Sequence, residues 1–311
     1  RKMSVRLDTP GAVPVRVRGQ FCYASADRGG AGGWQVLERT ISVEPLLDAL
    51  VHKTPTALES LVVVHDYPVS GMARRLMVTT VEGRSLGAWH SVPSGRDGSG
   101  RPGNVFTHGL VLYDDALRPA QLWESTQWLC PFGPHEVNLA RLPADDAFSC
   151  HGMLHALGHF LFDPLHWRIG TLALLLDAVH AALAGGPRVV LLVSDHDEAA
   201  RWIQAVQVCT DAHSAQRVHF STFERHDAPQ LESLGLHLAA VPAVDAAHFE
   251  RRPGVVVIDC AQFPQLGGPD GQPHRTSRGD EVAATAWSRL LLERCVGPDD
   301  LMVMVSAIDE L

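Results

Sequence analysis

The sequence predicts a mixed fold, α+β and α/β: a mainly β N-terminal domain followed by a β-α-β domain with a mostly parallel sheet. Three observations predict it. In the first half, β-rich runs at residues 75–81 and 86–92 are spaced as a hairpin. A glycine-rich loop then leads into another hydrophobic strand at residues 105–113. In the second half, apolar runs alternate with helical patterns, which is typical of parallel strands with right-handed crossovers.

Composition limits the class of protein. The 311 residues are enough for two domains with their own cores. A net charge of −9 argues against a general nucleic-acid binder, which needs a basic face. The six cysteines lie far apart without C-x-x-C spacing, so we interpret them as reduced thiols. With no secretory pattern and no apolar run long enough to cross a bilayer, we expect a cytoplasmic protein without membrane contact.

The first half divides into a lead-in at residues 1–16 and a β-rich domain at residues 17–145. Strands are expected at residues 17–25, 34–41, 61–67, 75–81, 86–92 and 105–113. The glycines of residues 29–33 and the polar residues 93–103 are expected to form loops. Helical spacing at residues 43–52, with Ser42 before it, predicts a capped helix. Residues 120–146 are expected to be irregular.

The second half divides into an α/β domain at residues 146–262 and, at residues 263–311, a linker with the start of a helical segment. Helices are expected at residues 149–162, 171–183, 198–209, 229–234 and 281–294. Strands are expected at residues 188–193, 217–222, 236–241 and 255–259. Thr171 and Asp195 are placed as N-caps, and Gly185 ends the helix before it. Because the last segment carries no stop signal, we expect the natural protein to continue beyond Leu311.

Several of these stretches resemble a known family. Residues 21–25 (FCYAS), 33–40 (GWQVLERT) and 101–112 resemble the N-terminal domain of bacterial GTPase-associated protein 1. Residues 202–205 (WIQA) and 220–223 (FSTF) resemble the middle domain of the same family. The resemblance implies a non-catalytic component of a bacterial conflict or immunity system, acting with a GTPase-type switch protein and other protein partners. It transfers no active-site residues and no cofactor.

Two nucleotide motifs are excluded. A P-loop needs a lysine after its second glycine, and neither Lys2 nor Lys53 has that context. Residues 98–103 match G-x-G-x-x-G, but a strand follows them where a dinucleotide site requires a helix. We therefore interpret that match as accidental.

Polar residues at the mouth of the strand at residues 105–113 suggest a ligand site. Arg101 supplies a fork of donors, and Asn104, Thr107 and His108 could orient an anion or a peptide. The alternative is structural: Arg101 and Asn104 fix the loop, and His108 is a buried imidazole with its hydrogen bonds satisfied.

Two further sets of residues could form a catalytic dyad or a metal site. Cys22 and His108 lie in predicted strands of one domain and could form a thiol dyad, although cysteine is also among the most buried residues. His151, His155 and His159 share one face of a helix, and with Cys150 or Asp163 they could hold zinc. Gly152 stands where the H-E-x-x-H motif has its glutamate, which argues against a metalloprotease.

The last candidate lies at the ends of the predicted parallel strands. Ser194, Asp195, Asp197 and Thr222 follow two of them, where open α/β sheets place ligands. The alternative is that Asp195 caps a helix and Asp197 complements its dipole. We expect a scaffold or adaptor without a cofactor; a hydrolase using Cys22 with His108, or zinc at the histidine cluster, is the alternative.

Overall fold

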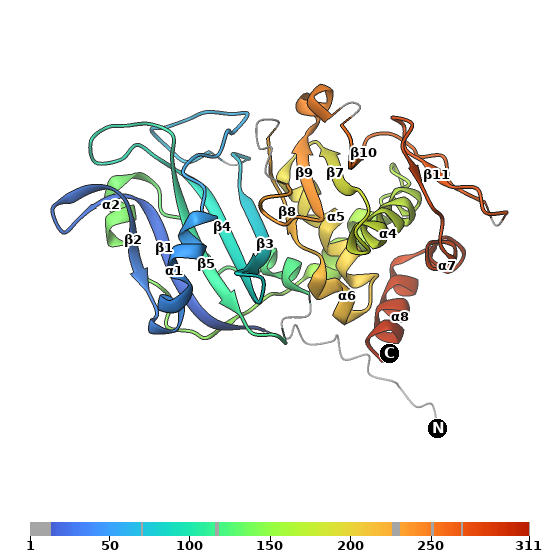
Figure 1. Ribbon diagram of the computed structural model, residues 1–311, viewed down its shortest axis with the longest axis horizontal. Coiled ribbons are helices and arrows are strands. Elements are labelled where there is room, and N and C mark those ends of the chain that lie inside the picture. The colour runs from blue at the N-terminus through green and yellow to red at the C-terminus, as the bar shows by residue number, and fades with distance from the viewer. Residues whose placement is uncertain are drawn as a thin grey trace.

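A computed structural model describes residues 14–69, 71–115, 118–225, 231–249, 252–268 and 270–310. Antiparallel strands build its N-terminal half, on the left of Figure 1: β1 (Val15–Arg28), β2 (Ala31–Arg39), β3 (Arg75–Val81), β4 (Ser85–Gly95) and β5 (Asn104–Leu112). Short helices cover or connect them: η1 (Ile41–Leu46), α1 (Leu47–His52), η2 (Pro119–Glu124) and α2 (Gly133–Leu139). The hairpin of β3 and β4 is confirmed.

Parallel strands build the second half: β7 (Arg188–Val193), β8 (Phe220–Ser221), β9 (Leu238–Pro242) and β10 (Val255–Asp259). Its helices are α3 (Met153–Leu161), α4 (Ile169–Leu183), α5 (His196–Val208), α6 (Ala212–Arg217), η3 (Ala243–Phe249), α7 (Ala286–Arg294) and α8 (Pro298–Asp309). Three short strands complete it: β6 (Ala147–Phe148), which pairs with β1, and β11 (His274–Arg275) with β12 (Glu281–Val282). The parallel β-α-β arrangement is confirmed.

The two halves share one mixed sheet. Among the described residues its order is β10-β7-β9-β8-β3-β4-β5-β1-β2, with β6 paired to β1. The junction is the antiparallel pairing of β8 with β3, where Met77 faces Ser221 and Val78 faces Phe220. Beside it, a buried ion pair joins Arg75 to Glu224 at 2.5 Å. The chain is therefore a mixed α/β protein with an antiparallel N-terminal part and a parallel C-terminal part in one sheet.

Hydrophobic packing on both faces of the sheet crosses the junction. On one face, Leu110 of the antiparallel part belongs to the same buried cluster as Trp202 of α5 and Leu172 of α4. On the other face, Phe21 and Trp89 belong to one cluster with residues of β7 and β9. Burial of apolar surface is the dominant favourable contribution to folding, so both parts are stabilised together.

Several expected elements of the first half differ in the structure. Gly29 and Gly30 both have positive φ angles and make a tight hairpin turn, so β2 starts at Ala31 where a loop was expected. Residues 61–67 form no strand, and both edges of β3, the next strand along the chain, are paired with β4 and β8. The helix expected at residues 43–52 begins as a 3-10 turn at Ile41. Its N-cap is Thr40, and the Ser42 hydroxyl contacts Thr40 without capping the helix.

Differences in the second half have similar local causes. α4 begins at Ile169, which places Thr171 inside the helix, and Gly185 after it has the expected positive φ. The strand expected at residues 217–222 shrinks to Phe220–Ser221, because α6 extends to Arg217. α7 begins at Ala286, since Glu281 and Val282 pair with β11. Residues 229 and 230 of one expected helix lie outside the described residues, and residues 231–234 form a turn. None of the helices described is long and apolar enough to cross a membrane.

Candidate functional site

Cys22 and His108 are brought together but not exposed. They are paired positions of β1 and β5, and their exposed fractions are 1% and 0%. Burial raises the pKa of the Cys22 thiol far above its ordinary value. Burial also lowers the pKa of His108 to about 3. A neutral, water-inaccessible thiol is a poor nucleophile, so this arrangement does not supply a thiolate near neutral pH.

The ring of His108 has its hydrogen bonds satisfied. The backbone N–H of Leu129 donates to its Nδ1 at 3.3 Å, which leaves Nε2 as the protonated nitrogen. That nitrogen donates to Oε1 of Gln20 at 3.0 Å. The ring also packs against Trp128 and Phe148. His108 thus has the geometry of a structural core histidine.

The four polar residues at the mouth of β5 do not converge. Arg101 pairs with Asp97 at 2.8 Å, and Asn104 donates to the carbonyl oxygens of Gly95 and Arg101. Thr107 is buried and bonded to Ser91, on the opposite face of the strand from His108. Arg101 and Asn104 therefore hold the loop before β5 in place.

The histidines of α3 form a pair. His155 and His159 lie one helical turn apart with their Nε2 atoms 3.1 Å from each other. His151 precedes the helix, and the Cys150 thiol is buried and donates to the carbonyl oxygen of Phe148. Within the described ranges, no three His, Cys, Asp or Glu side chains are grouped so that they could hold a metal ion.

The carboxyl ends of the parallel strands carry a groove that we call the carboxyl-edge groove. It is lined by Trp167 and Arg168 before α4, by Ser194, Asp195, Asp197 and Glu198 at the start of α5, and by residues 260–263 after β10. Its volume is about 470 Å³. Ser194, Asp195 and Asp197 line it as the sequence placed them, whereas Thr222 lines a smaller adjoining hollow. Asp195 also caps α5 by accepting from the N–H of Glu198 at 2.8 Å. The structural interpretation therefore holds for Asp195, and the ligand interpretation of these residues stays a prediction.

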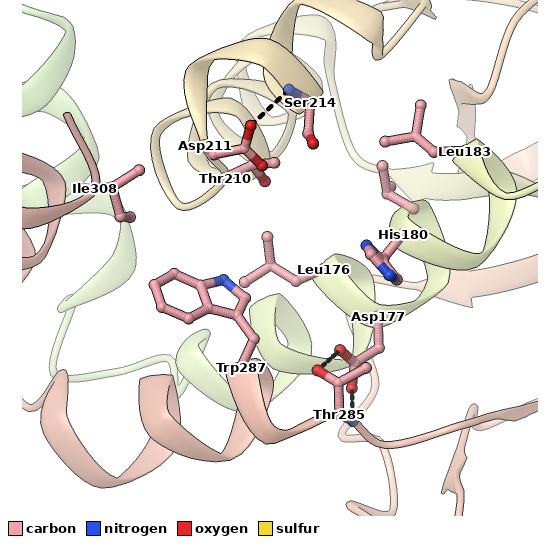
Figure 2. A pocket seen from close by; sticks show the side chains of 11 residues that line it. Leu176, Asp177, His180, Leu183, Thr210, Asp211, Ser214, Thr285, Trp287 and Ile308 are labelled. Carbon is pink, nitrogen blue, oxygen red and sulfur yellow. Dashed lines mark hydrogen bonds between the residues drawn. The ribbon is translucent and has the colours of Figure 1, made fainter. Parts of the chain in front are cut away.

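A second hollow, the helical pocket, is shown in Figure 2. It has a volume of about 360 Å³ and is mainly apolar, with Leu176, Val179 and Leu183 of α4, Trp287 of α7 and Ile308 of α8 in its wall. Thr210, Asp211 and Ser214 form the opposite side, around the start of α6. An open apolar pocket of this size suits one or two bulky side chains of a partner.

A buried polar network beside this pocket fixes the C-terminal helices. The Asp177 carboxylate of α4 accepts hydrogen bonds from His274 at 2.9 Å, from Ser288 at 2.6 Å and from Thr285 at 2.6 Å. Gly267 N–H donates to Nδ1 of His274, which leaves Nε2 as the donor to Asp177. Burial acts to raise the pKa of Asp177, but these hydrogen bonds outweigh it and lower the pKa. The network is satisfied internally and tethers α7 to α4.

Sequence reasoning missed both the helical pocket and the Asp177 network. The residues of the pocket come from α4, from the start of α6 and from the α7–α8 segment, which lie far apart in the chain. The network joins α4 to a segment that was expected to be a linker. The one available signal was Asp177 itself, a carboxylate inside an otherwise apolar helix, because such a charge needs buried partners.

With the sheet and its two hollows described, the chain can be placed in a family. The model of the N-terminal domain, type 2, of GTPase-associated protein 1 matches residues 18–148, and the model of the middle domain of that protein matches residues 158–262. The chain therefore belongs to the GTPase-associated protein 1 family.

Two curated relatives come from strains mc(2)155 and MKD8 of Mycolicibacterium smegmatis. Both are named "Putative ESX-1 scaffolding and assembly protein SaeB". They are 35% identical to this chain over 302 and 303 residues, and the match covers 94% of this chain. It covers 36% of each relative, so the chain spans about a third of their length.

Proposed function

We propose that this chain is a non-catalytic scaffold or adaptor part that works by binding other proteins in a GTPase-linked bacterial assembly in the cytoplasm. The family name supports a GTPase-type protein among the partners. In this proposal that partner is a switch protein and the assembly belongs to a conflict or immunity system. The name of the relatives supports a scaffolding role. In this proposal, residues 17–145 and 146–262 act as two domains that present separate surfaces.

One observation carries the proposal: the helical pocket exposes an apolar wall that no part of the described chain fills. Its floor is α4, whose side chains are otherwise buried, and Trp287 stands at one side. Interfaces gain most of their binding energy where a few bulky side chains enter a well-formed pocket. Cys22, His108 and Cys150 are, in contrast, buried, and His108 and Cys150 are committed to structural hydrogen bonds.

Co-purification of the chain with the proteins encoded beside it tests the proposal. Leu183→Glu places a charge in the wall of the pocket, at the last residue of α4. Leu139→Glu is the matched control, because Leu139 is the last residue of α2 and is 59% exposed. We expect Leu183→Glu to lose a partner that the wild-type chain and Leu139→Glu retain. A wild-type chain that retains none of these proteins would overturn the proposal.

A further inference from the structure

The carboxyl-edge groove has an exposed aromatic ring on each of two sides. Trp167, from the segment before α4, is 54% exposed, and Phe263, from the segment after β10, is 71% exposed. The Trp167 ring lies against Gly170, where an added Cβ would meet the ring at 2.5 Å. One side of the ring therefore packs against the first turn of α4. Large aromatic side chains that stay exposed beside a hollow are typical of binding surfaces.

The charged groups of the groove favour a cation. Among the described residues, Asp195, Asp197 and Glu198 line it without an ion pair to any arginine or lysine. The two arginines in its wall are already used: Arg168 lies over the ring of Phe160 and donates to its carbonyl oxygen, and Arg201 pairs with Glu124. The carboxylates also occupy the start of α5, where a bound anion would otherwise sit.

The net charge of residues 146–311, the half of the chain that contains the groove, also favours a cationic ligand. Residues 146–311 contain 21 acidic residues and 11 arginines, whereas residues 1–145 contain 14 acidic and 15 basic residues. The net charge of the parallel half is thus −10, against +1 for the antiparallel half. A field of this sign attracts basic surfaces and repels nucleic acid.

We propose that the carboxyl-edge groove binds an arginine-bearing segment of a partner protein. The guanidinium plane stacks on Trp167 or Phe263, and its N–H groups donate to the carboxylates of Asp195 and Asp197. Arginine fits better than lysine because its planar, weakly hydrated cation stacks on aromatic rings and donates two parallel hydrogen bonds. This inference rests on the proposed role of the chain as a protein-binding part and adds the chemistry of one partner.

The test uses the purified chain and a pair of fluorescent peptides. One is Gly-Leu-Arg-Arg-Leu-Gly, and its twin carries citrulline, the neutral isostere, at both arginine positions. Fluorescence anisotropy gives the two dissociation constants. We expect the arginine peptide to bind at least about tenfold more tightly than the citrulline peptide, since charge and stacking both act on it. Equal affinity for the two peptides, or binding of neither, would overturn the inference.

Matched variants locate the binding. Asp195→Asn with Asp197→Asn removes two charges and keeps an N-cap residue, so it should abolish the preference for arginine. Trp167→Ala should weaken the arginine peptide by several fold. Asp299→Asn with Asp300→Asn is the control, because it removes two charges from the first turn of α8, outside the groove. An equal loss in this control contradicts a specific site, and it leaves the scaffold proposal, tested by co-purification, intact.

Discussion

Cys22 on β1 and His108 on β5 face each other as paired residues inside the sheet, shielded from water. The pairing has a consequence for reactivity, because the thiolate is the reactive form and burial raises the pKa of Cys22. We expect iodoacetamide to modify the exposed Cys130 first and to reach Cys22 only after unfolding. Mass spectrometry of peptides from native and denatured samples measures this. Fast native labelling of Cys22 would reopen the thiol-catalysis alternative.

Acid should destabilise the protein through His108. Its pKa in the fold is about 3, below the ordinary value of about 6.5 that it regains on unfolding. Between these values the unfolded chain binds more protons, so stability is complete above the upper value and falls as the pH decreases. One such histidine contributes a slope of about 1.4 kcal/mol per pH unit. Urea unfolding at several pH values should show a smaller slope for His108→Gln than for the wild-type chain.

Removing Asp177 should destabilise the attachment of the C-terminal helices. Asp177→Ala leaves His274, Thr285 and Ser288 without their shared acceptor. Losing one member of a buried charged network costs about 3–5 kcal/mol. We expect a lower denaturation midpoint and faster amide exchange in α7. Asp270→Ala, at an exposed loop position, should stay within about 0.5 kcal/mol of wild type.

Gly109 is required by the packing of Phe21. A Cβ at position 109 would lie 2.0 Å from the Phe21 ring, which is completely buried. We expect Gly109→Ala to reduce the free energy of unfolding by about 2–3 kcal/mol, since a filled core cannot move aside cheaply. Gly98→Ala is the control, because its added Cβ would meet only Asp27, at 3.9 Å. Chemical denaturation of both variants compares them, and similar midpoints would contradict this explanation.

Strands with strong local patterns could be predicted from the sequence. β7 is a continuous apolar run and β3 with β4 is a short hairpin, so period and turn residues were sufficient. Residues 61–67 have strand composition as well, but β3, the next strand along the chain, pairs with β4 and β8, and residues 61–67 pair with none of the described strands. Such pairing between segments far apart in the chain cannot be read from a local window.

The candidate sites also divide into residues whose role follows from the local sequence and residues whose role depends on tertiary contacts. Asp195 was predicted as a helix cap and as a residue at the carboxyl edge, because both follow from its position between β7 and α5. The environment of His108 depended on Gln20 and Leu129, which tertiary folding brings to its ring. The helical pocket likewise exists only once α4, α6, α7 and α8 are assembled.

The strand β8 is two residues long, and it is the narrowest part of a sheet that is otherwise broad. The β3–β8 pairing, the Arg75–Glu224 ion pair and the hydrophobic clusters on both faces of the sheet all cross this junction. A partner bound to one half and a partner bound to the other would therefore be held in a fixed relative orientation by the shared sheet.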